Sequence, residues 1–219
     1  MLYIVNISQP RNAINAMKTV ILAGGLGTRI RDVSEVLPKP MIFIGGHPIL
    51  WHLLKIYSNY GLRDFIICCG YKGEVIKRYF YEQYTSSRDY TIDYKTGSIT
   101  YHSAIEEDWR ITFVDTGLET MTGGRLAKIR KYVGDDEFCM TYGDGLANID
   151  ITKLVKFHSQ QGRQVTVTAV KPPNRFGVLT LGENNSCTSF AEKPLDAAEW
   201  INGGFFVINP KALDLIEDY

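Results

Sequence analysis

The residues best suited to chemistry form a glycine-rich stretch near the N-terminus. Gly24, Gly25 and Gly27 follow a short apolar run, where glycine lets backbone N–H groups approach an anion closely. Thr28 and Arg29 come next, and a guanidinium can bind two phosphate oxygens through parallel hydrogen bonds. This combination predicts a loop that binds phosphate.

Lys39 is the second candidate for phosphate chemistry. It stands between Pro38 and Pro40, whose fixed φ angles make a stiff segment that can hold the ammonium group toward the glycine loop. For the glycine loop, the competing interpretation is a tight turn that binds no ligand, and for a lone Gly-x-Gly this interpretation carries about half the weight. The added Thr-Arg and Pro-Lys-Pro sequences favour the phosphate loop. The loop matches neither the Walker pattern nor the dinucleotide fingerprint, because Ile30 replaces the last glycine of the latter.

Asp144 is a candidate metal ligand. It lies between two glycines at the end of an apolar run, where an Asp is commonly a turn residue. Opposite a triphosphate it would instead suit Mg²⁺, which takes one or two carboxylates together with phosphate oxygens and water.

A second glycine-bearing loop spans residues 115–126 and enters a helix. One interpretation makes Thr122 an ordinary helix cap. The other presents Gly124 and Arg125 to a nucleotide, since exposed N–H groups at such a position favour phosphate or polar base edges. Both interpretations stay open on the residues alone.

These segments need a scaffold that brings strand ends together. Apolar runs at residues 20–23, 65–69, 111–114 and 138–142 predict buried strands, and segments with apolar residues at helical spacing alternate with them. Strands of this kind indicate a parallel sheet covered by helices on both faces. We therefore expect an α/β fold, a single Rossmann-like domain whose ligands lie beyond the carboxyl ends of the strands.

Some element boundaries are also predicted. Pro48 suits the first position of a helix, Asp150 caps another, and one helix is expected to run on through Ile129. Residues 90–94 and 98–102 alternate around a Thr-Gly turn, which predicts a small β-hairpin insertion at about 85–112, either a lobe or a contact between subunits.

Composition excludes several classes of protein. Lys plus Arg and Asp plus Glu number 24 each, and no basic stripe suggests nucleic-acid binding. No run of 18 apolar residues predicts a membrane span. Residues 1–16 are expected to be a loosely held N-terminal extension before a domain over 17–219. The spacing of the four cysteines favours neither a zinc site nor disulfides, and it therefore indicates a reducing, cytoplasmic location. These cysteines are Cys68, Cys69, Cys139 and Cys187.

Five segments together resemble the sugar-nucleotidyltransferases over residues 17–219. They are Leu-Ala-Gly-Gly-Leu-Gly-Thr-Arg from Leu22, Pro-Lys-Pro-Met from Pro38, Tyr-Gly-Asp-Gly from Tyr142, Phe-Ala-Glu-Lys-Pro from Phe190 and Ile-Asn-Gly-Gly-Phe-Phe-Val from Ile201. Within that family, the segments at 65–73, 115–126 and 141–145 are similar to those of glucose-1-phosphate cytidylyltransferases.

The resemblance implies a reaction between CTP and glucose 1-phosphate that gives CDP-glucose and pyrophosphate. Mg²⁺ is the implied cofactor with Asp144 as its ligand, and Lys39 and Arg29 are the implied catalytic residues. The implied nucleotide-binding residues are Leu22, Ala23, Gly24, Gly25, Gly27, Thr28, Arg29, Lys39, Gly124, Arg125, Tyr142 and Gly143. The implied sugar-phosphate-binding residues are Glu192, Lys193, Asn202 and Gly203.

The chain departs from the family at its C-terminal end. The family continues to a Trp-x-x-Met-Asp-Thr segment whose Asp is a second Mg²⁺ ligand, whereas this sequence ends at Tyr219. Two alternatives therefore stand beside the cytidylyl transfer: the same chemistry with another nucleotide or hexose 1-phosphate, and a truncated paralogue that binds nucleotide with little activity. We also expect a homo-oligomer, with no nucleic-acid or membrane partner.

Overall fold

The computed structural model describes residues 16–25, 37–172, 178–183, 186–191 and 200–216. The chain divides into two compact units, one of residues Met1–Thr166 with Phe205–Tyr219 and the other of Val167–Gly204. Each unit is described by itself. The expected extension at 1–16 lies almost wholly outside the described residues, so its loose attachment stays a prediction.

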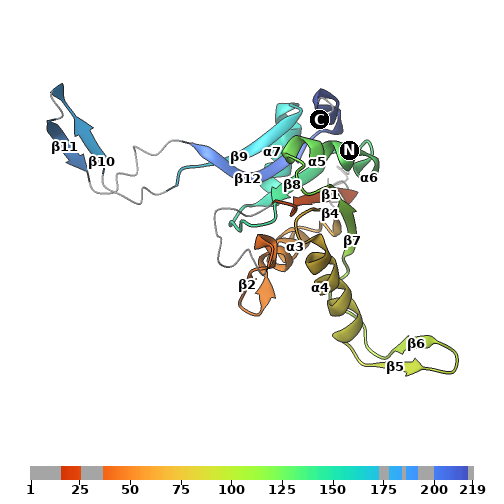
Figure 1. Ribbon diagram of the computed structural model, residues 1–219. Helices are drawn as coiled ribbons and strands as arrows, with labels where there is room; N and C mark the ends of the chain where they lie inside the picture. The colour runs from red at the N-terminus through yellow and green to blue at the C-terminus, as the bar shows by residue number, and fades with distance from the viewer. Residues whose placement is uncertain (1–15, 26–36, 173–177, 184–185, 192–199, 217–219) are drawn as a thin grey trace, which may run out of the picture. The chain divides into compact units, whose positions relative to one another are not determined.

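A six-stranded, mostly parallel sheet is the scaffold of the first unit, and its last two strands run on into the residues of the second unit (Figure 1). Its order is β7 (Arg110–Asp115), β4 (Asp64–Cys69), β1 (Lys18–Leu22), β8 (Phe138–Tyr142), β12 (Ile201–Ile208) and β9 (Val165–Val170). The pairs β7–β4, β4–β1 and β1–β8 are parallel, and β12 is antiparallel to β8. The predicted α/β fold with a mostly parallel sheet is therefore confirmed.

Alternate residues of the central strands face two separate cores. Ile21 and Ile67 pack in one core with α3 (Ile49–Asn59), α4 (Gly73–Ser86) and α7 (Ile151–Gln161). The residues beside them in sequence, such as Val20 and Ile66, pack in the other core with α5 (Thr122–Lys128), α6 (Arg130–Val133) and the 3-10 helix η3 (Pro210–Leu215). Figure 1 shows α3 and α4 on one side of β1 and β4, and α5 and α6 on the other. The two-sided cover that the apolar strands predicted is confirmed.

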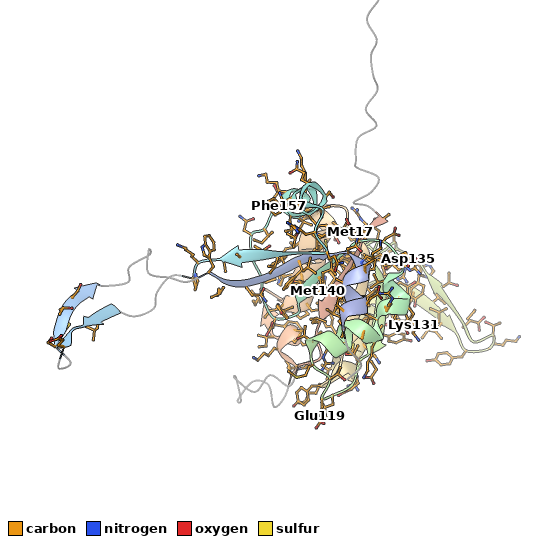
Figure 2. The ribbon with its side chains drawn as sticks, turned by 90° about the horizontal axis from the view of Figure 1, so that it is seen from above. Met17, Glu119, Lys131, Asp135, Met140 and Phe157 are labelled. Atoms are coloured by element: carbon orange, nitrogen blue, oxygen red, sulfur yellow. The ribbon has the colours of Figure 1, made fainter. Side chains whose placement is uncertain are left out.

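The side chains of Met17 and Met140 lie in the interior of this unit. Met140 of β8 is buried, and Met17 packs beside Cys139, whose Sγ lies 3.6 Å from the Met17 Sδ. Figure 2 shows Met17 and Met140 in the middle of the ribbon, whereas Phe157 and Glu119 lie at its edges.

Asp150 caps α7 by accepting a hydrogen bond from the Lys153 backbone N–H at 2.9 Å, which confirms the predicted cap.

Two predicted boundaries were wrong, and one of two open interpretations is excluded. Helix α3 begins at Ile49, because Pro48 pairs with Phe43 in a small hairpin of β2 (Phe43–Ile44) and β3 (His47–Pro48). The long helix expected through Ile129 is divided into α5 and α6, because the Ile129 N–H bonds the Leu126 carbonyl in a tighter turn. Thr122 is the first helical residue of α5 and not its cap, and no side chain caps that helix.

The predicted hairpin insertion is present. Strands β5 (Tyr90–Asp93) and β6 (Ser98–Tyr101) pair in an antiparallel ladder, and Gly97 has a φ of 71° in their turn. Figure 1 shows this hairpin extending beyond the end of α4. Its side chains are largely exposed, Tyr94 at 91%.

The second unit contains the antiparallel pair β10 (Val178–Leu181) and β11 (Cys187–Ala191). Among the residues that the structure describes in both units, no helix is long and apolar enough to cross a membrane.

Candidate active site

One cavity of about 270 Å³ collects residues from four of the predicted segments. They lie at or just after the ends of β1 and β8, in the loop before α5 and its first turn, or in the 3-10 helix η1 (Lys39–Met41). Its lining consists of Leu22, Ala23, Gly24, Gly25, Lys39, Pro40, Thr120, Met121, Thr122, Arg125, Tyr142 and Asp144. The cavity therefore lies at the carboxyl ends of parallel strands, where ligands bind in such sheets.

The first two glycines of the phosphate loop serve different purposes. Gly24 is buried, and a Cβ built on it would lie 2.6 Å from the Arg125 Cζ and 3.0 Å from the Gly70 backbone nitrogen. Gly25 is exposed, and among the described residues a Cβ on it would meet nothing within 4 Å. Packing therefore requires glycine at position 24, whereas position 25 is open toward the cavity and to a ligand.

Lys39 enters the cavity from a firmly held segment. Its neighbours Pro40 and Met41 are buried, and the Met41 N–H donates to the Pro38 carbonyl at 2.8 Å. Lys39 itself is half-buried. Lys39 thus lines the same cavity as Gly24 and Gly25, on a segment that two flanking prolines stiffen.

Asp144 follows a tight junction between β8 and β1. The Gly143 N–H donates to the Leu22 carbonyl at 2.9 Å, and a Cβ on Gly143 would lie 3.0 Å from the Pro40 Cγ. Gly143 therefore packs beneath the cavity, and Asp144 lines it. Among the described residues no cluster of three or more His, Cys, Asp or Glu could hold a metal by itself. A single carboxylate beside an anion cavity fits Mg²⁺, which shares its coordination with substrate phosphates and water.

Arg125 occupies an unusual position for a residue expected to bind nucleotide. Its side chain is 5% exposed, and its guanidinium lies within hydrogen-bond distance of five acceptors on the surrounding loops. Burial lowers the pKa of Arg125 from its usual value, but a guanidinium stays charged in proteins. Arg125 therefore adds a fixed positive charge to the wall of the cavity.

Gly124 supports this wall without lining the cavity. A Cβ on Gly124 would lie 2.8 Å from the Thr120 Cγ2, so glycine lets the loop fold closely onto α5. Lys128, one turn further along α5, donates to the Thr116 carbonyl at 2.9 Å and to the Thr120 Oγ1 at 3.2 Å. Four residues that line the cavity were assigned no binding role from the sequence. They are Thr120, Met121 and Thr122 of this loop, and Pro40 beside Lys39.

The remaining predicted site residues lie outside the described part of the first unit. Gly27, Thr28, Arg29, Glu192 and Lys193 lie outside the described residues. Asn202 and Gly203 belong to the second unit. There the Asn202 Oδ1 accepts a hydrogen bond from the Gly204 N–H at 2.8 Å, and a Cβ on Gly203 would lie 2.9 Å from the Thr168 carbonyl oxygen. Their roles toward the sugar phosphate stay predictions.

The arrangement suits an anionic ligand with several phosphates. Lys39 and Arg125 supply positive charge, the glycines after β1 leave the backbone accessible, and Asp144 offers a carboxylate for a shared cation. Larger hollows of about 600 and 540 Å³ lie around Trp109, but their linings contain no glycine loop and no residue of the predicted site. The smaller cavity is therefore the candidate active site.

Comparisons with known proteins agree with this chemistry. A family model described as nucleotidyl transferase matches residues 18–219. The chain is 51% identical over 203 residues to a glucose-1-phosphate cytidylyltransferase of Salmonella typhi, covering 92% of this chain and 79% of that protein. A probable glucose-1-phosphate cytidylyltransferase of Bacillus subtilis is 45% identical over 200 residues, covering 91% of this chain and 78% of its own length. Among solved structures, HddC from Yersinia pseudotuberculosis complexed with GMP-PN has a TM-score of 0.61 and 26% identity, with 93% of this chain and 80% of HddC covered.

Proposed function

Because this chain belongs to the nucleotidyl transferase family, we propose that it transfers a cytidylyl group from CTP to glucose 1-phosphate, giving CDP-glucose and pyrophosphate. The chain is an enzyme of that family. The observation that carries the proposal is the single cavity shared by Gly24, Gly25, Lys39 and Asp144. The choice of cytidine and glucose rests on the two cytidylyltransferase relatives.

The reaction needs alignment more than it needs a protein nucleophile. A phosphate oxygen of glucose 1-phosphate forms a bond to the α-phosphorus of CTP, and the bond from that phosphorus to the bridging oxygen breaks, so that pyrophosphate leaves with the electron pair. The attacking phosphate is already anionic, so no general base is required. Catalysis then comes from holding the two phosphates in line and placing positive charge where negative charge develops.

We propose that Lys39 supplies the positive charge that stabilises the transition state. Lys39 lines the same cavity as Gly24 and Gly25, and its backbone is held by buried neighbours, so little reorganisation is needed when substrate binds. We propose that Arg29 and Thr28 bind phosphate oxygens beside it. For glucose 1-phosphate, we assign Glu192, Lys193, Asn202 and Gly203.

Asp144 is the proposed Mg²⁺ ligand. Bound Mg²⁺ would neutralise charge on the phosphate oxygens of the nucleotide. Asp144 offers its carboxylate at the rim of the cavity, and the tight packing of Gly143 against Leu22 and Pro40 fixes where that rim lies.

The test is a panel of nucleotides with glucose 1-phosphate. The proposal expects pyrophosphate and a nucleotide sugar from CTP, with much slower turnover of dTTP, GTP and UTP. Turnover of dTTP or GTP without CTP would leave the chemistry intact but replace the proposed nucleotide. Tight binding of CTP without pyrophosphate release would instead favour a nucleotide-binding paralogue.

We further propose that the chain forms a homo-oligomer through the β5–β6 hairpin and acts in the cytoplasm. A two-stranded hairpin is marginal by itself in water, yet this one exposes Tyr90, Ile92, Tyr94 and Ile99. Light scattering of Tyr94→Asp/Ile99→Asp beside the unchanged chain tests the contact, since a smaller assembly is expected. The free state of all four cysteines supports a reducing compartment.

A further inference from the structure

We propose that Arg125 acts as a positioning residue, which holds the phosphate loop and the loop before α5 in the geometry that CTP requires. The effect on turnover rests on the proposed function, but the tie between the loops does not. The inference differs from the sequence expectation, in which Arg125 touches the nucleotide.

The guanidinium lies among the ends of three parallel strands. Its Nη2 donates to the Gly24 carbonyl after β1 at 2.9 Å. Its Nη1 donates to the Cys69 carbonyl at the end of β4 at 3.3 Å. After β7, its partners are the Thr116 Oγ1 at 2.6 Å, the Gly117 carbonyl at 2.8 Å and the Leu118 carbonyl at 3.2 Å. One planar group thus joins segments that are as far apart in sequence as Gly24 and Arg125.

The loops are packed around this guanidinium. A Cβ on Gly70 would lie 2.6 Å from the Arg125 Nη1, 2.6 Å from the Gly24 oxygen and 2.8 Å from the Gly117 oxygen. A Cβ built on Gly24 would also collide with the Arg125 side chain. Two glycines are therefore needed to admit the guanidinium, and the shorter reach and single nitrogen of Lys could not reproduce its fork of donors.

The tie has a direct consequence for phosphate binding. In a trans peptide the C=O and the following N–H point in opposite directions. Because the Gly24 carbonyl is fixed on Arg125, the Gly25 N–H is turned away from the guanidinium, on the loop that lines the cavity. The same residue therefore sets the direction of a donor that the triphosphate can use.

The charge of Arg125 is also only partly offset. All five of its hydrogen-bond acceptors are carbonyl or hydroxyl oxygens, which are neutral, and the Asp115 carboxylate acts on the guanidinium through its charge without a described hydrogen bond. A buried cation with neutral partners raises the potential of the adjacent cavity, where screening by water is weak. Arg125→Lys keeps this charge while it removes the fork, so it separates positioning from charge.

Amide hydrogen exchange of the free protein tests the tie without substrate. The Tyr71 N–H donates to the Gly24 carbonyl at 3.2 Å and the Thr116 N–H donates to the Cys69 carbonyl at 2.9 Å, so both report on carbonyls that Arg125 holds. In Arg125→Lys we expect both amides to exchange roughly tenfold faster, with core amides of β1 unchanged. Thr116→Val, which removes one acceptor, is a milder variant that should shift the Tyr71 amide in the same direction.

Lys128→Met is the matched control. Lys128 also lies on α5 and ties the loop at Thr116 and Thr120, but it makes no contact with the Gly24 carbonyl in the described hydrogen bonds. Its loss should leave the Tyr71 amide as in the unchanged chain.

In kinetics, Arg125→Lys should raise the KM for CTP roughly tenfold to a hundredfold while the KM for glucose 1-phosphate changes less than about twofold.

Two results would overturn the inference. Unchanged exchange in the free variant together with a raised KM for CTP would make Arg125 a contact residue. Faster exchange with unchanged kinetics would make it a structural residue without a role in substrate binding. If the unchanged chain itself does not turn over CTP, the proposed function fails, whereas the exchange measurement still decides whether Arg125 ties the loops.

Discussion

Two adjacent glycines offer a sharp test of how the cavity is built. In Gly24→Ala the new Cβ would collide with the Arg125 guanidinium, 2.6 Å from its Cζ, and the guanidinium cannot move without losing hydrogen bonds to several carbonyls. Overpacking of this kind costs about 1–3 kcal/mol of unfolding free energy. For a chain of this size we therefore expect the melting temperature to fall by about 2–12 °C.

Gly25→Ala should behave in the opposite way. In the part of the chain that the structure describes, a Cβ there meets nothing within 4 Å, so the unfolding free energy should change by less than about 0.5 kcal/mol. The added methyl would stand where the triphosphate approaches the loop. Loss of one hydrogen bond to a charged phosphate is worth about 1.5–3 kcal/mol, so the KM for CTP should rise about 10-fold to 150-fold.

Thermal melts of both variants without ligand, followed by CTP titration and steady-state kinetics, measure the two effects separately. The account requires a destabilised Gly24→Ala and a stable Gly25→Ala with impaired CTP binding. A Gly24→Ala protein that melts like the unchanged chain would refute the packing around Arg125. A Gly25→Ala protein with normal KM for CTP would refute the close approach of phosphate to that residue.

Three further predictions follow from the same geometry. Gly143→Ala, whose Cβ would lie 3.0 Å from the Pro40 Cγ, should displace the segment that carries Lys39 and lower kcat about tenfold with little change in secondary structure by circular dichroism. Asp144→Asn should raise the Mg²⁺ concentration needed for CTP binding, as titration calorimetry would show; an unchanged requirement would remove Asp144 from the metal site. Burial raises the pKa of three thiols from 9.0, to about 12 for Cys68 and Cys139 and about 11 for Cys69. These thiols stay protonated in the fold but ionise when unfolded, so the unfolding free energy should be unaffected below pH 9 and fall above it, by up to about 1.4 kcal/mol per thiol per pH unit until each folded pKa is reached. Denaturant titrations from pH 7 to 11 would show that slope, and a flat profile would contradict it.

The sheet could be predicted from sequence because its signals are local. Runs such as the one from Phe65 to Cys69 are apolar on both faces, and that pattern has few explanations besides a buried parallel strand. The cap at Asp150 and the turn at Gly97 likewise depend only on neighbouring residues. The start of α3 was missed because the two-residue strands β2 and β3 are too short to leave a periodic pattern.

The site was predictable in part. Gly24, Lys39 and Asp144 follow recognisable strand ends or prolines, and the parallel topology brings them to one cavity. The part played by Arg125 could not be predicted, because its hydrogen bonds to Gly24 and Cys69 join segments separated by 101 and 56 residues. No local pattern tells a guanidinium that binds phosphate from one that binds backbone carbonyls.

The most direct test of the central claim is pyrophosphate release from CTP and glucose 1-phosphate with Mg²⁺, measured for this chain beside Lys39→Ala. We expect equimolar pyrophosphate and CDP-glucose from the unchanged chain. For Lys39→Ala we expect a rate at least about a hundredfold lower, equivalent to about 3 kcal/mol of lost transition-state stabilisation, at an unchanged melting temperature. No release by the unchanged chain, or equal rates for the two proteins, would contradict the claim.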